Sequence, residues 1–351
     1  MTGESVLITG GTGHLGFCVL RYALEYGYNV RAAVRSEAKA AQLKSNAALK
    51  ALGKDKQLSF VVVPDFLAPG AFDEAVQGVK YIIHVASPLA TKVPEDGDYE
   101  KFYIEPAVQG TLGVFESAKK AGGIERIVVT SSNVALQPVS SFLSESGEVY
   151  TTESRLEVPR GPYPAPFVAY CASKIAAFNA TEAWIKKEKP EFDTIHIHPS
   201  FIFGRDDLIT TTAGFQTGTN RIPLNLALGQ PLTPFTSIVN NYNYVNDTAR
   251  LHVLSLDPKI EGNQSFISSS SGQDGMTYDQ VNEIVARRFP EEVKKGILPN
   301  NSHVDTVVSK WDNNKTEKTF GFKFTGLEEA VVSVVEHYLE IFAKEQTELK
   351  N

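Results

Sequence analysis

The sequence opens with a strand, a glycine-rich turn and a helix in immediate succession. Ser5 to Thr9 is a short, bounded apolar run that predicts a buried strand, and helical spacing follows from Leu15 to Tyr26. Between them, Gly10 suits a tight turn, Gly13 lets a diphosphate approach, and Gly16 lets the helix pack closely on the strand. The helix N-terminus offers amide donors and partial positive charge, so the turn predicts a dinucleotide site.

Strand and helix patterns continue to alternate as far as His198. Further strands are predicted at 29–34, 58–63, 79–85, 127–130 and 194–198, and helices at 36–52, 69–77, 99–121 and 167–189. This alternation predicts an α/β fold: a Rossmann-type doubly wound parallel sheet with right-handed crossovers. The long irregular connection 136–166 is expected to wrap the rim of the active site.

The alternation breaks after Gly204, where a stretch rich in Thr, Gly and Pro begins. We therefore expect an NADP-binding Rossmann domain at 1–200, plus roughly 236–256, with a smaller interleaved C-terminal substrate lobe at 201–235 and 257–351.

Composition excludes several classes of function. A net charge of -7 and the lack of a Lys/Arg cluster argue against nucleic-acid and anionic-membrane partners, and no apolar run is long enough to span a membrane. The two cysteines, Cys18 and Cys171, support neither a disulfide framework nor a metal site. His196 and His198 lack further ligands, so we expect no metal and assign both a structural role. The N-terminus shows no secretory pattern, which predicts a cytoplasmic protein.

Tyr170 and Lys174 lie four residues apart on the predicted helix 167–189, and so on the same face. An ammonium ~4 Å from a phenol is worth roughly 4 kcal/mol at an effective dielectric of ~20, or about three pKa units. The pair is therefore expected to lower the pKa of Tyr170 and to form a proton-donating device that works near neutral pH.

The residues near the end of the second strand, 29–34, indicate which nicotinamide cofactor is preferred. An NAD site usually has an acidic residue near that position, but Arg31 and Arg35 stand there instead. An arginine fork suits a 2′-phosphate, which favours NADPH. Arg35 is the first choice and Lys39 a weaker helper; the alternative is that the arginines only face solvent.

Five motifs together resemble the extended short-chain dehydrogenase/reductases. They are the glycine-rich turn, the strand end Ser131-Ser132, Tyr170-x-x-x-Lys174, Pro199-Ser200 and the stretch from Tyr244 to Ala249. Arg35, Ala86-Ser87-Pro88 and the stretch from Trp311 to Phe322 are similar to the branch of dihydroflavonol 4-reductases, cinnamoyl-CoA reductases and fungal NADPH-dependent aldehyde, ketone and methylglyoxal reductases.

The resemblance implies catalytic roles for three residues. Tyr170 would protonate the carbonyl oxygen as hydride arrives, Lys174 would assist it and hold the nicotinamide ribose, and Ser132 would orient the carbonyl, with Ser131 as the alternative. The helix 99–121 lacks the Asn that supports the catalytic Lys in many relatives, which counts against a nucleotide-sugar epimerase.

The resemblance and the strand ends together define the expected site. The cofactor-binding residues are expected to be Gly10, Thr12, Gly13, His14, Leu15, Gly16, Arg35, Lys39, Asp65, Phe66, Ala86, Ser87, Tyr170, Lys174, Pro199 and Ile202. The substrate pocket is expected to include Pro88, Asn133, Phe167, Phe215 and Phe235, and Ile202 is a candidate for it as well. Each pocket residue could equally belong to the core. A largely apolar pocket fits an aldehyde or ketone with hydrophobic groups better than a diphosphosugar or CoA thioester.

The leading hypothesis is an NADPH-dependent carbonyl reductase acting on a small molecule, as a monomer or homodimer. The alternatives are an NAD(P)-dependent alcohol or hydroxysteroid dehydrogenase, against which the arginines speak, and a non-catalytic NADP-binding regulator, against which the Tyr-Lys pair speaks. Fold alone does not decide the natural substrate.

Overall fold

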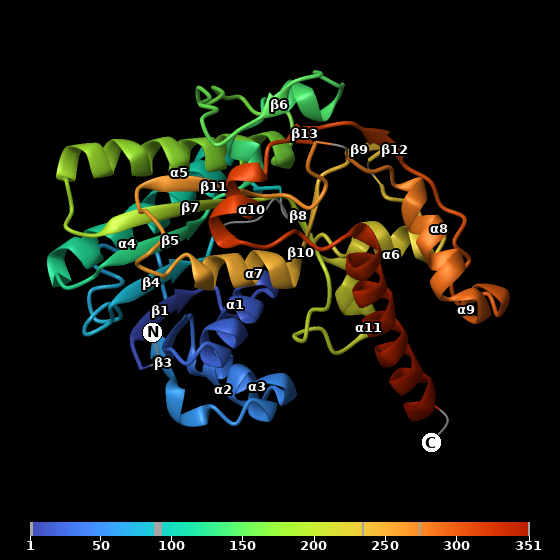
Figure 1. Ribbon diagram of the computed structural model, residues 1–351, viewed down its shortest axis with the longest axis horizontal. Helices are drawn as coiled ribbons and strands as arrows, with labels where there is room; N and C mark the ends of the chain where they lie inside the picture. The colour runs from blue at the N-terminus through green and yellow to red at the C-terminus, as the bar shows by residue number, and fades with distance from the viewer. Residues whose placement is uncertain (1–2, 88–92, 234, 274, 350–351) are drawn as a thin grey trace. The chain divides into compact units, whose positions relative to one another are not determined.

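The computed structural model describes residues 3–87, 93–233, 235–273 and 275–349 (Figure 1). The chain forms two compact units. The first comprises residues 1–139, 152–198 and 249–266, and the second comprises 140–151, 199–248 and 267–351. No helix in the described ranges is long and apolar enough to cross a membrane.

A seven-stranded sheet forms the centre of the first unit, in the order β11-β7-β5-β4-β1-β2-β3. Its strands are β1 (Ser5–Thr9), β2 (Asn29–Val34), β3 (Leu58–Val62), β4 (Tyr81–His84), β5 (Arg126–Thr130), β7 (Asp193–Pro199) and β11 (Gln264–Ser268). The ladders from β3 across to β7 are parallel. The strand order reverses direction at β1 and β4, where ligands bind in doubly wound sheets. The predicted fold class is confirmed.

Helices cover both faces of this sheet, with α4 and α5 on one face and α1 on the other (Figure 1). They are α1 (His14–Glu25), α2 (Glu37–Ser45), α3 (Ala47–Ala51), α4 (Glu105–Ala121) and α5 (Pro166–Glu188). The apolar stripe of α4 buries Phe115 against strand residues such as Ile82 and Ile127. The ring of Trp184 on α5 lies 5.5 Å from that of Phe115, so the two helices close the core together. This packing holds α5 against α4 and against one face of the sheet.

Three helical predictions differ from the structure. The predicted helix 36–52 is interrupted at Asn46, whose side chain accepts hydrogen bonds from Ala48 and Leu49 and starts α3. The segment 69–77 forms turns, not a regular helix; Gly70 near its start and Gly78 directly after it both have positive φ.

The predicted helix 99–121 begins as a π-helix, η2 (Glu100–Ile104), in which the Glu105 amide bonds to the carbonyl of Glu100. Pro106 has no N–H, so it cannot make the next α-helical bond, and the wider turn precedes α4.

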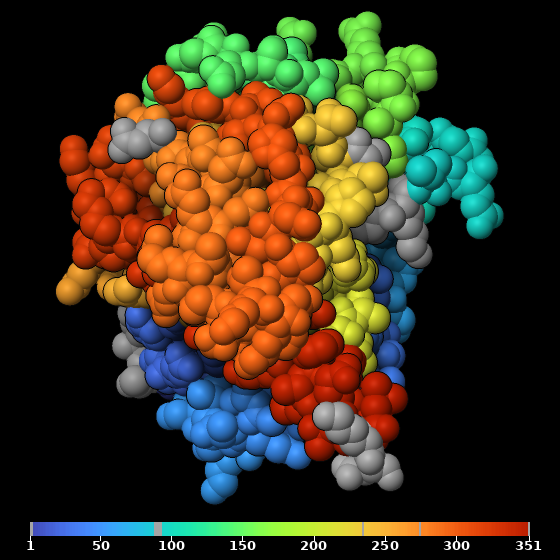
Figure 2. Space-filling model, turned by 90° about the vertical axis from the view of Figure 1, so that its right-hand side faces the viewer, coloured from blue at the N-terminus to red at the C-terminus, as the bar shows by residue number. Residues whose placement is uncertain are grey.

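Helices and short parallel strand pairs make up the second unit. Their bounds are β6 (Val149–Tyr150), β8 (Phe201–Phe203), α6 (Arg221–Ala227), β9 (Ser237–Val239), β10 (Tyr242–Tyr244), α7 (Val245–Leu254, which continues into the first unit), α8 (Asp279–Arg288), α9 (Pro290–Lys294), β12 (Asp305–Val307), β13 (Lys310–Trp311), α10 (Asn314–Phe320) and α11 (Leu327–Glu348). Strand β8 pairs with β10, β9 with β12, and β6 with β13. Leu224, Val281 and Val331 share one apolar core, and Figure 2 shows the orange surface of α8 and α9 above the red surface of α11.

Candidate active site

The glycine-rich turn joins β1 to α1 at the point where the strand order reverses. Gly10 has φ +78°, and a Cβ there would lie 2.7 Å from the Ala86 amide nitrogen. A Cβ on Gly16 would lie 2.1 Å from the Gly10 carbonyl oxygen. Both positions therefore require glycine for the fold itself.

Gly13 is different, because a Cβ there would meet only the Gly10 carbonyl oxygen, at an ordinary 3.6 Å. The fold does not require glycine at this exposed position, and the lack of a side chain leaves the turn open to a ligand. Helix α1 starts with no side-chain cap and no acidic residue in its first turn. Its first amides and positive dipole end suit a diphosphate. The side chain of Leu15 is buried, so only its backbone can serve such a ligand.

Arg35 follows β2 and lies over the ring of Phe66, with its guanidinium carbon 5.7 Å from the ring centroid. Within the described residues it makes no hydrogen bond or ion pair. Arg31 instead donates to the carbonyls of Ala75 and Gln77 at 2.9 and 2.6 Å, which commits it to the fold. Of the two arginines, Arg35 is thus the one available to an anion.

A cleft of about 580 Å³ runs from Arg35 along the carboxyl ends of the strands. Its lining includes the predicted residues Arg35, Asp65, Phe66, Ala86 and Ser87. The sequence did not indicate the opposite wall, formed by Phe102, Pro106, Ala107, Gly110 and Thr111. The π-turn that brings Phe102 there left no clear sequence signal except Pro106. Lys39 lies outside this lining and its ammonium donates to Gln42 at 3.0 Å.

Tyr170 and Lys174 lie one turn apart on α5, as the spacing predicts. The Lys174 ammonium lies 5.8 Å from the centroid of the Tyr170 ring, and its side chain is almost fully buried. Ser132 follows β5, and its hydroxyl donates to Asn133 Oδ1 and accepts from the Val134 amide, both at 3.3 Å. Ser131, the alternative, lines a small cavity beside Lys174.

Burial dominates the titration of this pair. It raises the pKa of Tyr170 to about 12, and the Ser132 hydroxyl acts in the opposite direction. Burial also lowers the pKa of Lys174 to about 8. The direction for Tyr170 is opposite to the sequence-based expectation, because burial removes the phenolate from water, and Lys174 is not among the groups that shift this pKa.

The sequence analysis missed a polar pair that joins the ends of β1 and β4. Thr9 Oγ1 lies 2.9 Å from His84 Nδ1, and both residues are buried. Thr9 Oγ1 also accepts from the amides of Val85 and Ala86, both at 3.2 Å. A histidine within an apolar strand gives no signal of this contact, which links positions 75 residues apart.

His196 and His198 point from β7 toward Phe178 of α5, with ring centroids 5.0 and 4.9 Å from that ring. Burial lowers their pKa values to about 4 and about 3. No group of three or more metal-ligating side chains occurs among the residues that the structure describes.

The predicted substrate residues have varied surroundings. Phe215 is fully buried in the second unit against His337 and Tyr338, which fits the alternative that this residue belongs to the core and not to a pocket. Phe235 is 42% exposed beneath the Arg221 guanidinium. Pro88 lies outside the described residues.

The remaining predicted residues lie on elements of both units. In the first unit, Asn133 is buried and Phe167 is partly buried in the first turn of α5. In the second unit, Pro199 is buried, and the Ile202 carbonyl on β8 accepts from Thr219 at 2.5 Å.

A parallel doubly wound sheet with this turn at its switch point defines a dinucleotide-binding α/β protein of the Rossmann type. The sequence profile of the NAD dependent epimerase/dehydratase family matches residues 6–266, and the chain belongs to this family. The resemblance to the extended short-chain dehydrogenase/reductases is thereby confirmed.

The relatives include proteins named as reductases. The chain is 44% identical over 352 residues to the ketoreductase CTB6 of Cercospora nicotianae, covering 99% of this chain and 98% of that protein. It is 27% identical to a putative NADPH-dependent methylglyoxal reductase, GRP2, of Candida albicans, covering 93% and 96%.

Among solved structures, the yeast methylglyoxal/isovaleraldehyde reductase Gre2 complexed with NADPH superposes with a TM-score of 0.79. The two share 25% sequence identity, and the match covers 97% of this chain and 99% of that one. The chain is therefore similar over nearly its whole length to reductases that use a nicotinamide cofactor.

Proposed function

We propose that this protein is an NADPH-dependent carbonyl reductase that reduces an aldehyde or ketone to an alcohol. The observation that carries the proposal is the arrangement of Ser132 at the end of β5 with Tyr170 and Lys174 on α5. The Ser132 hydroxyl lowers the pKa of Tyr170 against the effect of burial, and the Lys174 ammonium lies 5.8 Å from the centroid of the Tyr170 ring. The reductase names of the relatives support the same reaction.

The proposed chemistry divides between cofactor and protein. A bound reduced nicotinamide supplies the hydride that adds to the carbonyl carbon. The Tyr170 hydroxyl donates its proton to the carbonyl oxygen, on which negative charge develops. With a pKa of about 12, this phenol holds its proton throughout the neutral range and is a ready donor. The Ser132 hydroxyl hydrogen-bonds the same oxygen, and the Lys174 ammonium stabilises the phenolate that remains.

The cofactor preference rests on Arg35. Its guanidinium stands at the cleft without a carboxylate partner among the described residues, and such a group suits a 2′-phosphate. The remaining proposed contacts are the glycine-rich turn for the diphosphate, Asp65 and Phe66 beside the adenosine, and Lys174 at the nicotinamide ribose. The description of the family names NAD and not NADP, so the preference for NADPH is proposed from Arg35 and not from family membership.

The substrate is proposed to be a small carbonyl compound with hydrophobic groups. The pocket assignments to Asn133, Phe167 and Phe235, the cytoplasmic location and the monomeric or dimeric state remain predictions.

The test is NADPH oxidation, followed by absorbance, with a panel of aldehydes and aryl ketones, for the wild type beside Tyr170→Phe. Turnover that disappears in the variant supports a carbonyl reductase, and a repeat with NADH measures cofactor preference. Tight NADPH binding without turnover of any carbonyl would instead favour the regulator hypothesis.

A further inference from the structure

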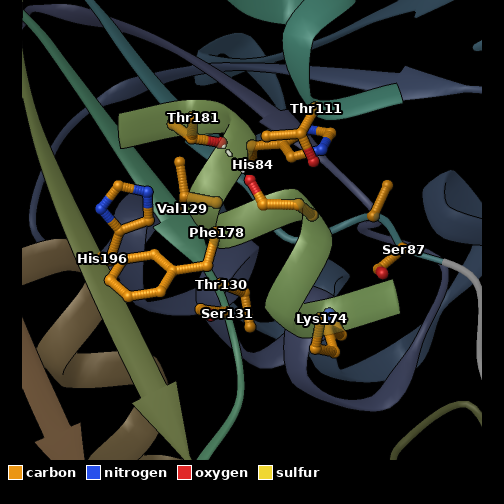
Figure 3. Close-up of a pocket in the computed structure, with 12 residues that line it drawn as sticks. His84, Ser87, Thr111, Val129, Thr130, Ser131, Lys174, Phe178, Thr181 and His196 are labelled. Carbon is orange, nitrogen blue, oxygen red and sulfur yellow. Dashed lines mark hydrogen bonds between the residues drawn. The ribbon is translucent and has the colours of Figure 1, made fainter. Parts of the chain in front are cut away.

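A small cavity lies beside Lys174, enclosed by β4, β5, β7, α4 and α5 (Figure 3). It leaves about 20 Å³ that the centre of a water molecule can occupy. About 10–15 Å³ is enough for one water, provided that polar partners surround it. The polar lining residues are His84, Ser87, Thr111, Thr130, Ser131, Lys174, Thr181 and His196.

The hydrogen bonds of Thr9 fix the protonation of His84. A hydroxyl has two lone pairs and one hydrogen, and the amides of Val85 and Ala86 occupy both lone pairs of Thr9 Oγ1. The Thr9 hydrogen must therefore be donated to His84 Nδ1. Burial lowers the pKa of His84 to about 3, so the ring is neutral and carries its single N–H at Nε2.

Lys174 brings an ammonium with three N–H donors to the same cavity. Within the described residues it makes no hydrogen bond or ion pair, and a buried charge without acceptors is costly. The titratable groups facing it are Tyr170 on α5, His84 on β4, and His196 and His198 on β7; all four are neutral at pH 7. No carboxylate among the described residues contributes to its titration.

We propose that the cavity binds one water, which accepts hydrogen bonds from His84 Nε2 and Lys174 Nζ and donates to Thr111 Oγ1. Thr111 can accept, because its own hydroxyl hydrogen goes to the Ala107 carbonyl at 2.9 Å. His84 is then a positioning residue that holds the ammonium through this water. Helix α4 contains no asparagine that could support Lys174, and the water takes over that role.

This inference rests on the proposed function, since it assigns Lys174 its role in carbonyl reduction. The water places a negative oxygen dipole on the ammonium and so favours its charged form. The Lys174 pKa is already lowered to about 8. Loss of the water is expected to lower it further, so reduction that needs the charged lysine will fail at lower pH.

The test compares the pH dependence of kcat with NADPH for the wild type, Thr111→Val and His84→Leu. We expect the alkaline limb to move down by roughly half to one pH unit in both variants. His84→Gln retains an N–H donor near the Nε2 position and is expected to restore the wild-type limb. Thr316→Val is the matched control, because this buried hydroxyl also donates to a backbone carbonyl, that of Ile267, but in the second unit.

A high-resolution crystal structure of the NADPH complex gives a second readout. We expect water density within hydrogen-bond distance of both Lys174 Nζ and His84 Nε2. Unchanged alkaline limbs in both variants, or an empty cavity in the crystal, would overturn the inference. If the wild type reduces no carbonyl compound, the proposed function fails and the crystal structure alone decides whether the water is bound.

Discussion

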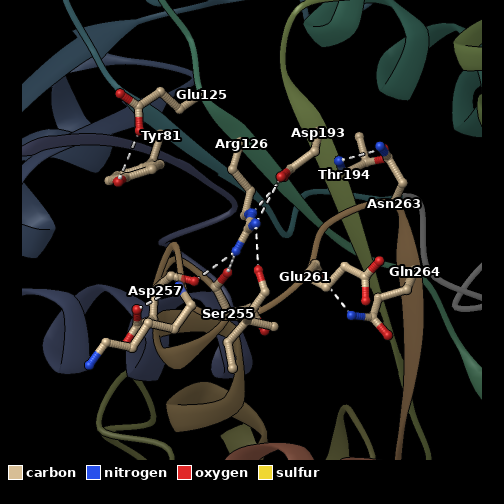
Figure 4. Close-up of polar contacts among 12 residues, drawn as sticks. Tyr81, Glu125, Arg126, Asp193, Thr194, Ser255, Asp257, Glu261, Asn263 and Gln264 are labelled. Atoms are coloured by element: carbon tan, nitrogen blue, oxygen red, sulfur yellow. Dashed lines mark hydrogen bonds and ion pairs between the residues drawn. The ribbon is translucent and has the colours of Figure 1, made fainter.

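Replacing Asp193 by asparagine is expected to destabilise the first unit, because it breaks the ion pair between Asp193 and the buried Arg126. Arg126 and Asp193 form a two-pronged ion pair between β5 and β7, with N–O distances of 2.5 and 2.8 Å (Figure 4). Arg126 also donates to the carbonyls of Ser255, Asp257 and Ile260, so it ties the segment after α7 to the sheet.

The burial of the two side chains sets the magnitude. The Arg126 side chain is 6% exposed and that of Asp193 is 31% exposed. Breaking a fully buried pair costs about 3–5 kcal/mol, and the exposure of Asp193 together with the oxygen that asparagine keeps reduces this to roughly 2 kcal/mol. The thermal midpoint should then fall by roughly 4–8 °C, measured by circular dichroism.

Glu182→Gln provides the matched control. Glu182 forms the same two-pronged pair with Arg155, at 2.9 and 2.8 Å, but these side chains are 39% and 41% exposed. An exposed pair contributes about 0.5 kcal/mol, so the midpoint should move by only about 1–2 °C. Equal losses of stability in the two variants would refute the argument that burial sets the value of the pair.

Three further predictions concern the cofactor site and the buried histidines. Arg35→Gln should raise the KM for NADPH roughly tenfold and leave the KM for NADH little changed, because it removes a charge-assisted hydrogen bond to the 2′-phosphate. The control, Arg31→Gln, should lower the thermal midpoint without this selectivity. Equal effects of Arg35→Gln on both cofactors would contradict the assignment of Arg35 to the 2′-phosphate. Gly13→Ala should weaken NADPH binding in a fluorescence titration with an unchanged thermal midpoint, whereas Gly16→Ala should lower the midpoint itself, since its Cβ has no space. His196 has a pKa of about 4 in the folded protein against about 6.5 in the unfolded chain, so the unfolded chain binds more protons and stability is lost as the pH falls from 6.5 toward 4. His196→Gln should therefore reduce the decrease of the thermal midpoint between pH 6.5 and 4. An unchanged dependence of the midpoint on pH would rule out His196 as the cause of this decrease.

The sequence predicted the sheet because strands buried on both faces leave continuous apolar runs, and β2 (Asn29–Val34) was predicted with its observed bounds. The Tyr170–Lys174 spacing likewise survives folding, since it depends only on helical geometry. Contacts between distant segments were not predictable in the same way. Thr9 and His84 meet only because β1 and β4 are neighbours in the sheet, and neither residue stands out in its own strand.

Burial was the other quantity that local sequence did not provide. It reversed the expected direction of the Tyr170 pKa and placed Phe215, one of the expected pocket residues, in a core. The turns at 69–77 escaped prediction because the alanines favour a helix while the glycines at both ends prevent its extension.

The most direct test of the proposed chemistry is the rate of NADPH-dependent carbonyl reduction in Tyr170→Phe, measured beside NADPH affinity. Removing the proton donor should lower kcat by about 10²- to 10⁴-fold and leave NADPH affinity within a few-fold of the wild type. Tyr26→Phe, the same change at the C-terminal end of α1, should leave both unchanged. Wild-type turnover in Tyr170→Phe would contradict the assignment of Tyr170 as the proton donor.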